Sequence, residues 1–205
     1  MCGLAGIYSH KPVATELYDS LIHLQHRGQD AAGITTYNKH MHKTKGLGLV
    51  RDIFTEKKIK RLKGNIGIAH TRYPTHGGFG HGEIQPFWTS VPYGIALAHN
   101  GNLTNYNELA KNITSNESRY LNTNSDTEVL LHLFAELLHD RNKHDNDKEF
   151  FDNLCSALEN IYKHVRGAYS VIALVIGKGL VAFRDPHGIR PLVRGIRSKS
   201  NGEHD

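Results

Sequence analysis

The second residue of the chain is a cysteine, Cys2, and a glycine, Gly3, follows it. Removal of Met1 would leave Cys2 with a free α-amine whose pKa is about 8. Such an amine can act as the general base for the thiol of its own residue, so Cys2 is a candidate N-terminal nucleophile. A cysteine at this position can also be an accident of translation initiation, and Cys2 alone favours that simpler interpretation.

A second candidate is the segment His99-Asn100-Gly101-Asn102, which follows the apolar run GIALA. The side-chain amide of Asn100 and the backbone N–H of Gly101 could stabilise the oxyanion formed when an amide is attacked. Asn-Gly is also the strongest short signal for a tight turn. Without further context, the turn interpretation is favoured.

Arg72 and Asp126 could bind the two charged groups of a free amino acid. Arg72 follows a β-rich run, and its planar guanidinium suits a carboxylate. Asp126 lies in the first turn of an expected helix and could bind an ammonium group. The alternatives are a surface arginine in a loop and a carboxylate stabilised by the helix dipole.

Composition and charge argue against several classes of function. The net charge is +5, which could suggest a nucleic-acid partner. The one dense basic run, residues 57–63, has no interleaved aromatic residues, however, and it fits the solvated face of a short helix better than a nucleic-acid site. No apolar run is long enough to cross a bilayer and no secretory signal is visible, so we expect no membrane partner and a cytoplasmic location. His70, His76 and His81 have spacings that suit no compact zinc site, and no metal is expected.

The hydrophobic pattern predicts the elements that would position these residues. Short apolar runs predict strands at 3–8, 66–70, 94–98, 170–176 and 180–184, the last two forming a hairpin. Helical spacing predicts helices over 15–26 and 151–165, the latter burying Cys155, and a third that begins with a capping box of Ser125 and Glu128. Because strands and helices do not alternate strictly, the order predicts an α+β fold with antiparallel sheets.

Eight segments, in order along the chain, resemble the class II glutamine amidotransferases, whose nucleophile is an N-terminal cysteine. They are CGLAGIYS after Met1, LQHRGQDAAGI (24–34), IAHTRYPTHG (68–77), IQPF (84–87), YGIALAHNGNLTNYNEL (93–109), NTNSDTEVLLHLFAEL (122–137), GAYSVIALV (167–175) and FRDPHGIRPLV (183–193). Within the family, the match is closest to the glutaminase domain of the amidophosphoribosyltransferases, which begin purine synthesis. The alternative is the glutaminase domain of another class II amidotransferase.

The resemblance implies a fold, an activity and a set of site residues. The fold would be a four-layer αββα sandwich of the N-terminal-nucleophile hydrolase type, with mainly antiparallel sheets. The activity would be hydrolysis of glutamine to glutamate and ammonia through a glutamyl thioester. The implied roles are Cys2 as nucleophile, Asn100 and Gly101 as oxyanion hole, Arg72 and Asp126 as ligands of the glutamine head group, Tyr73, Thr75 and His76 as pocket lining, and Arg27 as an arginine ordered beside the nucleophile.

The resemblance also implies a domain plan and partners. Residues 1–197 would form a glutamine amidotransferase type 2 domain that is truncated at its C-terminus, with a polar tail at 198–205. We expect the phosphoribosyltransferase domain that follows in the family to be absent from this chain, an ammonia-accepting phosphoribosyltransferase domain or chain to be its partner, and homo-oligomers to be possible. No cofactor is expected in this chain: magnesium would come only with that domain, and two cysteines cannot build an iron–sulfur cluster. The alternative is a catalytically silent, truncated domain that binds glutamine or a partner.

Overall fold

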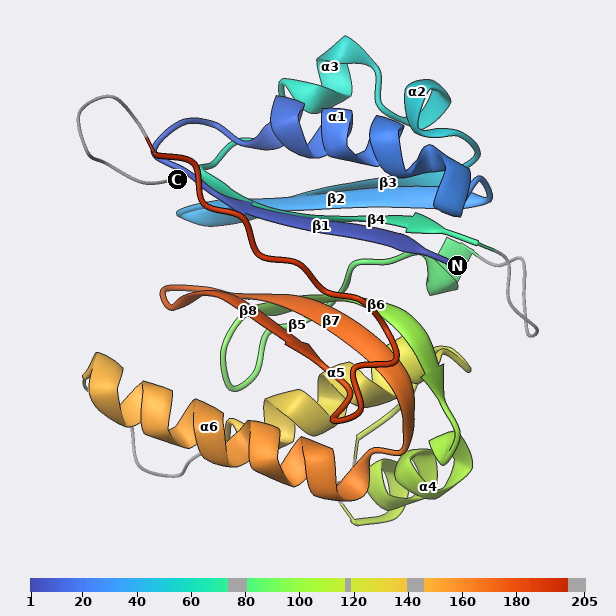
Figure 1. Cartoon of the computed structure of the whole chain (residues 1–205), viewed down its shortest axis with the longest axis vertical. Helices are drawn as coiled ribbons and strands as arrows, with labels where there is room; N and C mark the ends of the chain where they lie inside the picture. Colours follow the sequence, from blue (N-terminus) through green and yellow to red (C-terminus); the bar gives the residue numbers. More distant parts are fainter. Residues whose placement is uncertain (74–80, 117–118, 140–145, 199–205) are drawn as a thin grey trace.

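The computed structural model describes residues 1–73, 81–116, 119–139 and 146–198. Two four-stranded sheets lie face to face, and helices cover the outer face of each (Figure 1). Every strand pair is antiparallel. The predicted α+β four-layer sandwich is therefore confirmed.

The first sheet has the strand order β1-β4-β2-β3. Its strands are β1 (Gly3–Tyr8), β4 (Ile66–Arg72), β2 (Ala31–Asn38) and β3 (His40–Leu47). The covering elements are α1 (Ala14–Leu24), the 3₁₀ turn η1 (Gln25–Arg27), α2 (Val50–Ile53) and α3 (Glu56–Ile59). Leu17 and Leu21, one helical turn apart in α1, are fully buried against this sheet, so the helix is held by its apolar face.

The second sheet has the order β5-β6-β7-β8. Its strands are β5 (Phe87–Thr89), β6 (Ile95–Leu103), β7 (Gly167–Val175) and β8 (Gly179–Arg184), and the 3₁₀ turn η2 (His81–Glu83) precedes β5. Its outer face is covered by α4 (Tyr106–Asn116), α5 (Asp126–Leu137) and α6 (Asp147–His164). Phe134 of α5 and Tyr169 of β7 are fully buried in the core between them.

A third apolar core fills the space between the two sheets. It is thin, because β6 contributes two alanines and β1 contributes Gly6. A Cβ at Gly6 would lie 2.8 Å from Cγ2 of Ile172 on the opposite sheet, so glycine allows the sheets to approach. The buried members of this core are Ile66, Ile68, Ala96, Ala98, Ile172 and Leu174.

Three local predictions are wrong in detail. Cys155 is exposed, because α6 turns Phe150, Ala157 and Ile161 inward instead of the face that carries Cys155. The apolar residues of the run 3–8 also predict a buried strand, but β1 is only partly buried, with Tyr8 55% exposed.

The third concerns the start of α5. Ser125 is its N-cap, as predicted, and accepts the N–H of Thr127. Glu128, however, does not reach back to Ser125. It accepts hydrogen bonds from the backbone N–H groups of Asn122 and Thr123 instead, and so fixes the loop before the helix.

Within the described ranges, no helix has the length and apolar character needed to cross a bilayer.

Candidate active site

Cys2 lies immediately before β1. The N-terminus of the chain lies at one end of the space between the two sheets (Figure 1). Its thiol accepts the backbone N–H of Tyr73 at 3.5 Å, and its carbonyl oxygen accepts Nε–H of Arg27 at 3.1 Å. The next residue, Gly3, pairs with Thr71 of β4. The end of β4 and the turn after α1 therefore hold Cys2 in place, and the structure brings Arg27 beside it.

Strand alternation directs three of the predicted site residues into the space between the sheets. Side chains two residues apart in a strand share one face. By this rule Cys2, Arg72 and Asn100 lie on the faces of β1, β4 and β6 that carry the inter-sheet residues Leu4, Ile68 and Ala98. Residues that are distant in sequence thus converge at one end of the sandwich.

The thiol of Cys2 is not activated by its surroundings. Burial raises its pKa, the N–H of Tyr73, the N-terminal amine and the charge of Arg72 oppose the rise without cancelling it, and Asp126 adds to it. The thiol is therefore protonated near neutral pH, and attack by Cys2 requires a base.

The segment His99–Asn102 lies inside β6, so the turn interpretation is wrong. Asn100 pairs with Ser170 and Gly101 with Tyr169 of β7. A Cβ at Gly101 would overlap the carbonyl oxygen of Ala168, so only glycine fits this close approach.

The second half of β6 runs past the end of β5, which pairs only with residues 95–97. On this open side the N–H of His99 donates to Oε1 of Gln85 at 2.6 Å, and the N–H of Leu103 donates to Oδ2 of Asp126 at 3.2 Å. Backbone groups alternate in direction along a strand. The N–H of Gly101, midway between these two, therefore points to the same side, which is the orientation that an oxyanion-hole donor needs.

Asp126, the first residue of α5, lies beside this open edge with a side chain that is 25% exposed. Its Oδ1 is 3.5 Å from Nδ1 of His99. Burial alone would raise the pKa of Asp126, but the hydrogen bond and charge of His99, with the N–H groups of Leu103 and Thr127, lower it below its usual value. Asp126 is therefore a carboxylate near neutral pH and can accept an ammonium group.

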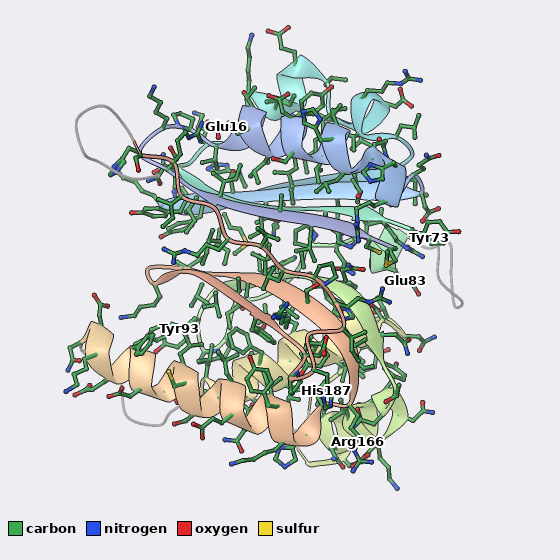
Figure 2. The ribbon with its side chains drawn as sticks, in the orientation of Figure 1. Glu16, Tyr73, Glu83, Tyr93, Arg166 and His187 are labelled. Atoms are coloured by element: carbon green, nitrogen blue, oxygen red, sulfur yellow. The ribbon has the colours of Figure 1, made fainter. Side chains whose placement is uncertain are left out.

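Arg72 is held by carboxylates. Its Nη2 is 3.0 Å from Oε2 of Glu83 and its Nε is 3.4 Å from Oδ2 of Asp30, and only 6% of its side chain is exposed. Glu83 thus contacts the residue before Tyr73, and both Tyr73 and Glu83 are labelled at this end of the sandwich in Figure 2. A bound carboxylate would have to share or displace these partners.

The sequence did not identify Glu83 or Asp30 as part of the site. Asp30 lies in the HRGQD motif, which is the one signal that could have pointed to it. The backbone N–H of Tyr73 donates to the thiol of Cys2, and the residue is 53% exposed. The predicted pocket residues Thr75 and His76 lie outside the described residues. In the part of the chain that the structure describes, no three acidic, histidine or cysteine side chains are grouped to hold a metal ion.

Comparison with known proteins gives consistent matches. Residues 78–202 match a family model described as a glutamine amidotransferase domain. The chain is 48% identical over 203 residues to an amidophosphoribosyltransferase of Pseudomonas aeruginosa, with 98% of the chain and 40% of that protein covered. It is 49% identical over 202 residues to the Escherichia coli protein of the same name, with 96% and 39% covered.

Among solved structures, one described as the allosteric regulatory enzyme of purine biosynthesis superposes with a TM-score of 0.76 and 32% identity, over 93% of this chain and 38% of that one. The chain thus spans about 40% of the length of the curated relatives it matches.

Proposed function

Because this chain belongs to the family of glutamine amidotransferase domains, we propose that it hydrolyses the side-chain amide of glutamine, with Cys2 as the nucleophile. The observation that carries the proposal is that the charge of Asp126 acts on the Cys2 thiol, and that the same carboxylate accepts the N–H of Leu103 on the edge of β6 that carries Asn100 and Gly101. These are the nucleophile, the oxyanion donors and the ammonium ligand that the reaction requires.

Removal of Met1 creates the base in this mechanism. The freed α-amine of Cys2, with a pKa of about 8, takes the proton of its own thiol, directly or through one water. This transfer is needed because burial raises the pKa of the thiol. The thiolate then attacks Cδ of glutamine.

The attack creates a tetrahedral intermediate with a negative oxygen. The side-chain amide of Asn100 and the N–H of Gly101 donate hydrogen bonds to this oxygen. The protonated amine then donates its proton to the leaving nitrogen. The C–N bond breaks, ammonia departs, and a glutamyl thioester on Cys2 remains. Water, deprotonated by the same amine, then hydrolyses the thioester to glutamate.

Two residues would hold the glutamine head group. Asp126 binds its α-ammonium group, and Arg72 binds its α-carboxylate, in exchange for part of its contact with Glu83 or Asp30. Tyr73, Thr75 and His76 would line the pocket, and Arg27 would keep the Cys2 backbone in place.

We further propose that the ammonia is used by a phosphoribosyltransferase domain or chain, as in the amidophosphoribosyltransferases. The chain spans about 40% of these relatives, and the remaining length of each is sufficient for a second domain. Magnesium would bind with that second unit rather than with the residues described in this chain. Homo-oligomers of the assembled protein are part of the same proposal.

The experiment that tests hydrolysis is glutamate release from glutamine by the purified chain. Cys2→Ala should reduce the rate by at least about 10³-fold, because it removes the nucleophile. A chain with one serine inserted between Met1 and Cys2 keeps the thiol but moves the amine, and it should be similarly inactive.

Intact mass should show that the active protein has lost Met1. Equal rates for the unmodified and Cys2→Ala chains would reject the proposal, and full activity with the inserted serine would reject the amine as base.

A further inference from the structure

The side chain of His99 is buried beside Asp126 of the candidate site. It is 2% exposed, it belongs to the same strand as Asn100 and Gly101, and it contacts Asp126 at the start of α5. We propose that His99 is a positioning residue that aligns the ammonium-binding carboxylate with the oxyanion hole. This inference rests on the proposed function of the site and adds a residue to it.

The first contact is with the N-terminus of α5. Nδ1 of His99 lies 3.5 Å from Oδ1 of Asp126 and 3.2 Å from Oγ1 of Thr127. The backbone N–H of His99 donates to Oε1 of Gln85, and Nε2 of Gln85 donates to Oγ1 of Thr127 at 2.9 Å. These contacts close a ring, so the position of His99 is fixed from both its backbone and its side chain.

The residues of this hydrogen-bonded ring are buried. Thr127 is 0% exposed and Gln85 is 8% exposed, so water does not compete for these groups. Buried polar networks that are closed in this way hold their members in one arrangement. The carboxylate of Asp126 is thereby held in one orientation beside the open edge of β6.

The second contact is with Gly101. Because His99 and Gly101 are two residues apart, they share the helix-facing side of β6. A Cβ at Gly101 would lie only 2.8 Å from Nε2 of His99, so the imidazole ring packs directly against the glycine backbone. Displacement of the ring would therefore disturb both the carboxylate and the backbone N–H that should face the oxyanion.

The groups that face His99 differ on its two sides. His70 of β4 approaches it from the inter-sheet side, and Asp126 lies on the helix side. Burial lowers the pKa of His70 to about 3, so His70 is neutral and Asp126 is the charged neighbour of the His99 ring. A donor at the Nδ1 position is then the feature of His99 that Asp126 requires.

Asparagine and leucine in place of His99 form a matched pair for testing this requirement. Both side chains branch at Cγ and have nearly the same size. The asparagine would present an amide nitrogen as many bonds from Cα as Nδ1, whereas leucine presents a methyl group there. A role confined to core packing predicts that leucine is tolerated at least as well as asparagine in this buried site.

The measurement is the affinity of glutamine for the Cys2→Ala protein, by titration calorimetry, since this chain binds substrate without consuming it. Adding His99→Leu should weaken binding about 10-fold, the loss expected for one hydrogen bond to a charged group. Adding His99→Asn should leave the dissociation constant within about threefold of the parent. Thermal unfolding of each variant checks that it is folded.

The decisive comparison repeats both substitutions together with Asp126→Asn. If His99 acts through Asp126, the His99→Leu and His99→Asn proteins should then bind glutamine equally, because coupled residues are not additive. If the leucine variant does not fold, His99→Gln replaces it with the same expectation, since its amide lies one bond farther from Cα.

Equal affinities for the leucine and asparagine variants, or an unchanged difference between them after Asp126→Asn, would overturn the inference. So would a Cys2→Ala protein that does not bind glutamine. Glutamine binding without glutamate release by the unmodified chain rejects the proposed hydrolysis but leaves His99 in its positioning role. Cys2-dependent hydrolysis that His99→Leu does not affect supports the proposed hydrolysis and rejects the positioning role of His99.

Discussion

Gly101→Ala is the substitution for which the structure gives the clearest expectation. The added methyl group would overlap the carbonyl oxygen of Ala168 and lie 2.7 Å from Cα of Tyr169 and 2.8 Å from Nε2 of His99. Two of these three neighbours are backbone of β7, which pairs with β6 over nine residue pairs and cannot give way locally. The methyl group must therefore push β6 outward, displace the imidazole, or both.

The expected cost can be worked out from these contacts. Adding a methyl group to a well-packed core costs about 1–3 kcal/mol. For a chain of this length, each kcal/mol shifts the midpoint of thermal unfolding by roughly 2–4 °C. We therefore expect a decrease of roughly 2–12 °C in the midpoint. If Gly101 also supplies an oxyanion donor, glutaminase kcat should fall a further ~10²–10³-fold in protein that is still folded.

Gly195→Ala is the matched control, because nothing lies within 4 Å of a Cβ at Gly195. Thermal unfolding and glutamate release should be measured on both variants at a temperature at which both are folded. An unchanged midpoint for Gly101→Ala would show that the close approach to β7 is not rigid. A lower midpoint with unchanged kcat would remove Gly101 from the oxyanion hole.

Three further outcomes are expected. Burial lowers the pKa of His70 to about 3. Below about pH 6.5 the unfolded chain therefore binds a proton that the folded chain does not, and the free energy of unfolding falls by up to ~1.4 kcal/mol for each unit by which the pH decreases. His70→Phe should flatten the pH dependence of thermal unfolding, and a slope equal to that of the unmodified chain would contradict this. In protein that retains Met1, iodoacetamide should modify the exposed Cys155 at least about 10-fold faster than the partly buried Cys2, whose thiol pKa is raised by burial. Peptide mass spectrometry measures both rates, and the opposite order would show that Cys2 is accessible and ionised. Gly28→Ala would place a methyl group 2.5 Å from the carbonyl carbon of Arg72 and should lower the free energy of unfolding, measured in urea, by ~1–3 kcal/mol. An unchanged urea midpoint would mean that the end of β4 moves freely.

The sequence predicts those parts of the fold whose signal is local. β1 matches its predicted bounds, and the hairpin of β7 and β8 lies where the two apolar runs predict it. The three main helices are present, but the face of α6 is wrong for Cys155. The apolar residues of α6 admit two adjacent faces, and contact with the second sheet selects the one that carries Phe150.

The errors in the site arise where long-range pairing overrides a local signal. Asn100-Gly101 has the composition of a turn, yet it pairs with Ser170 and Tyr169 of β7, far along the chain, and so remains in a strand. Arg72 contacts Asp30, which immediately precedes β2, and Glu83, which ends the 3₁₀ turn η2. These two residues form no regular sequence pattern with Arg72. Such contacts depend on the assembled sheets, and no property of the single residues indicates them.

The placement of Met1 has a consequence for when the protein matures. Its side chain accepts a contact from Nη1 of Arg190 but is still 57% exposed in the folded chain. An aminopeptidase could therefore reach this residue after folding is complete, so maturation need not take place on the ribosome. If removal of Met1 frees the nucleophile as proposed, a pool of untrimmed, folded chain would be inert, and a single proteolytic cut would activate it.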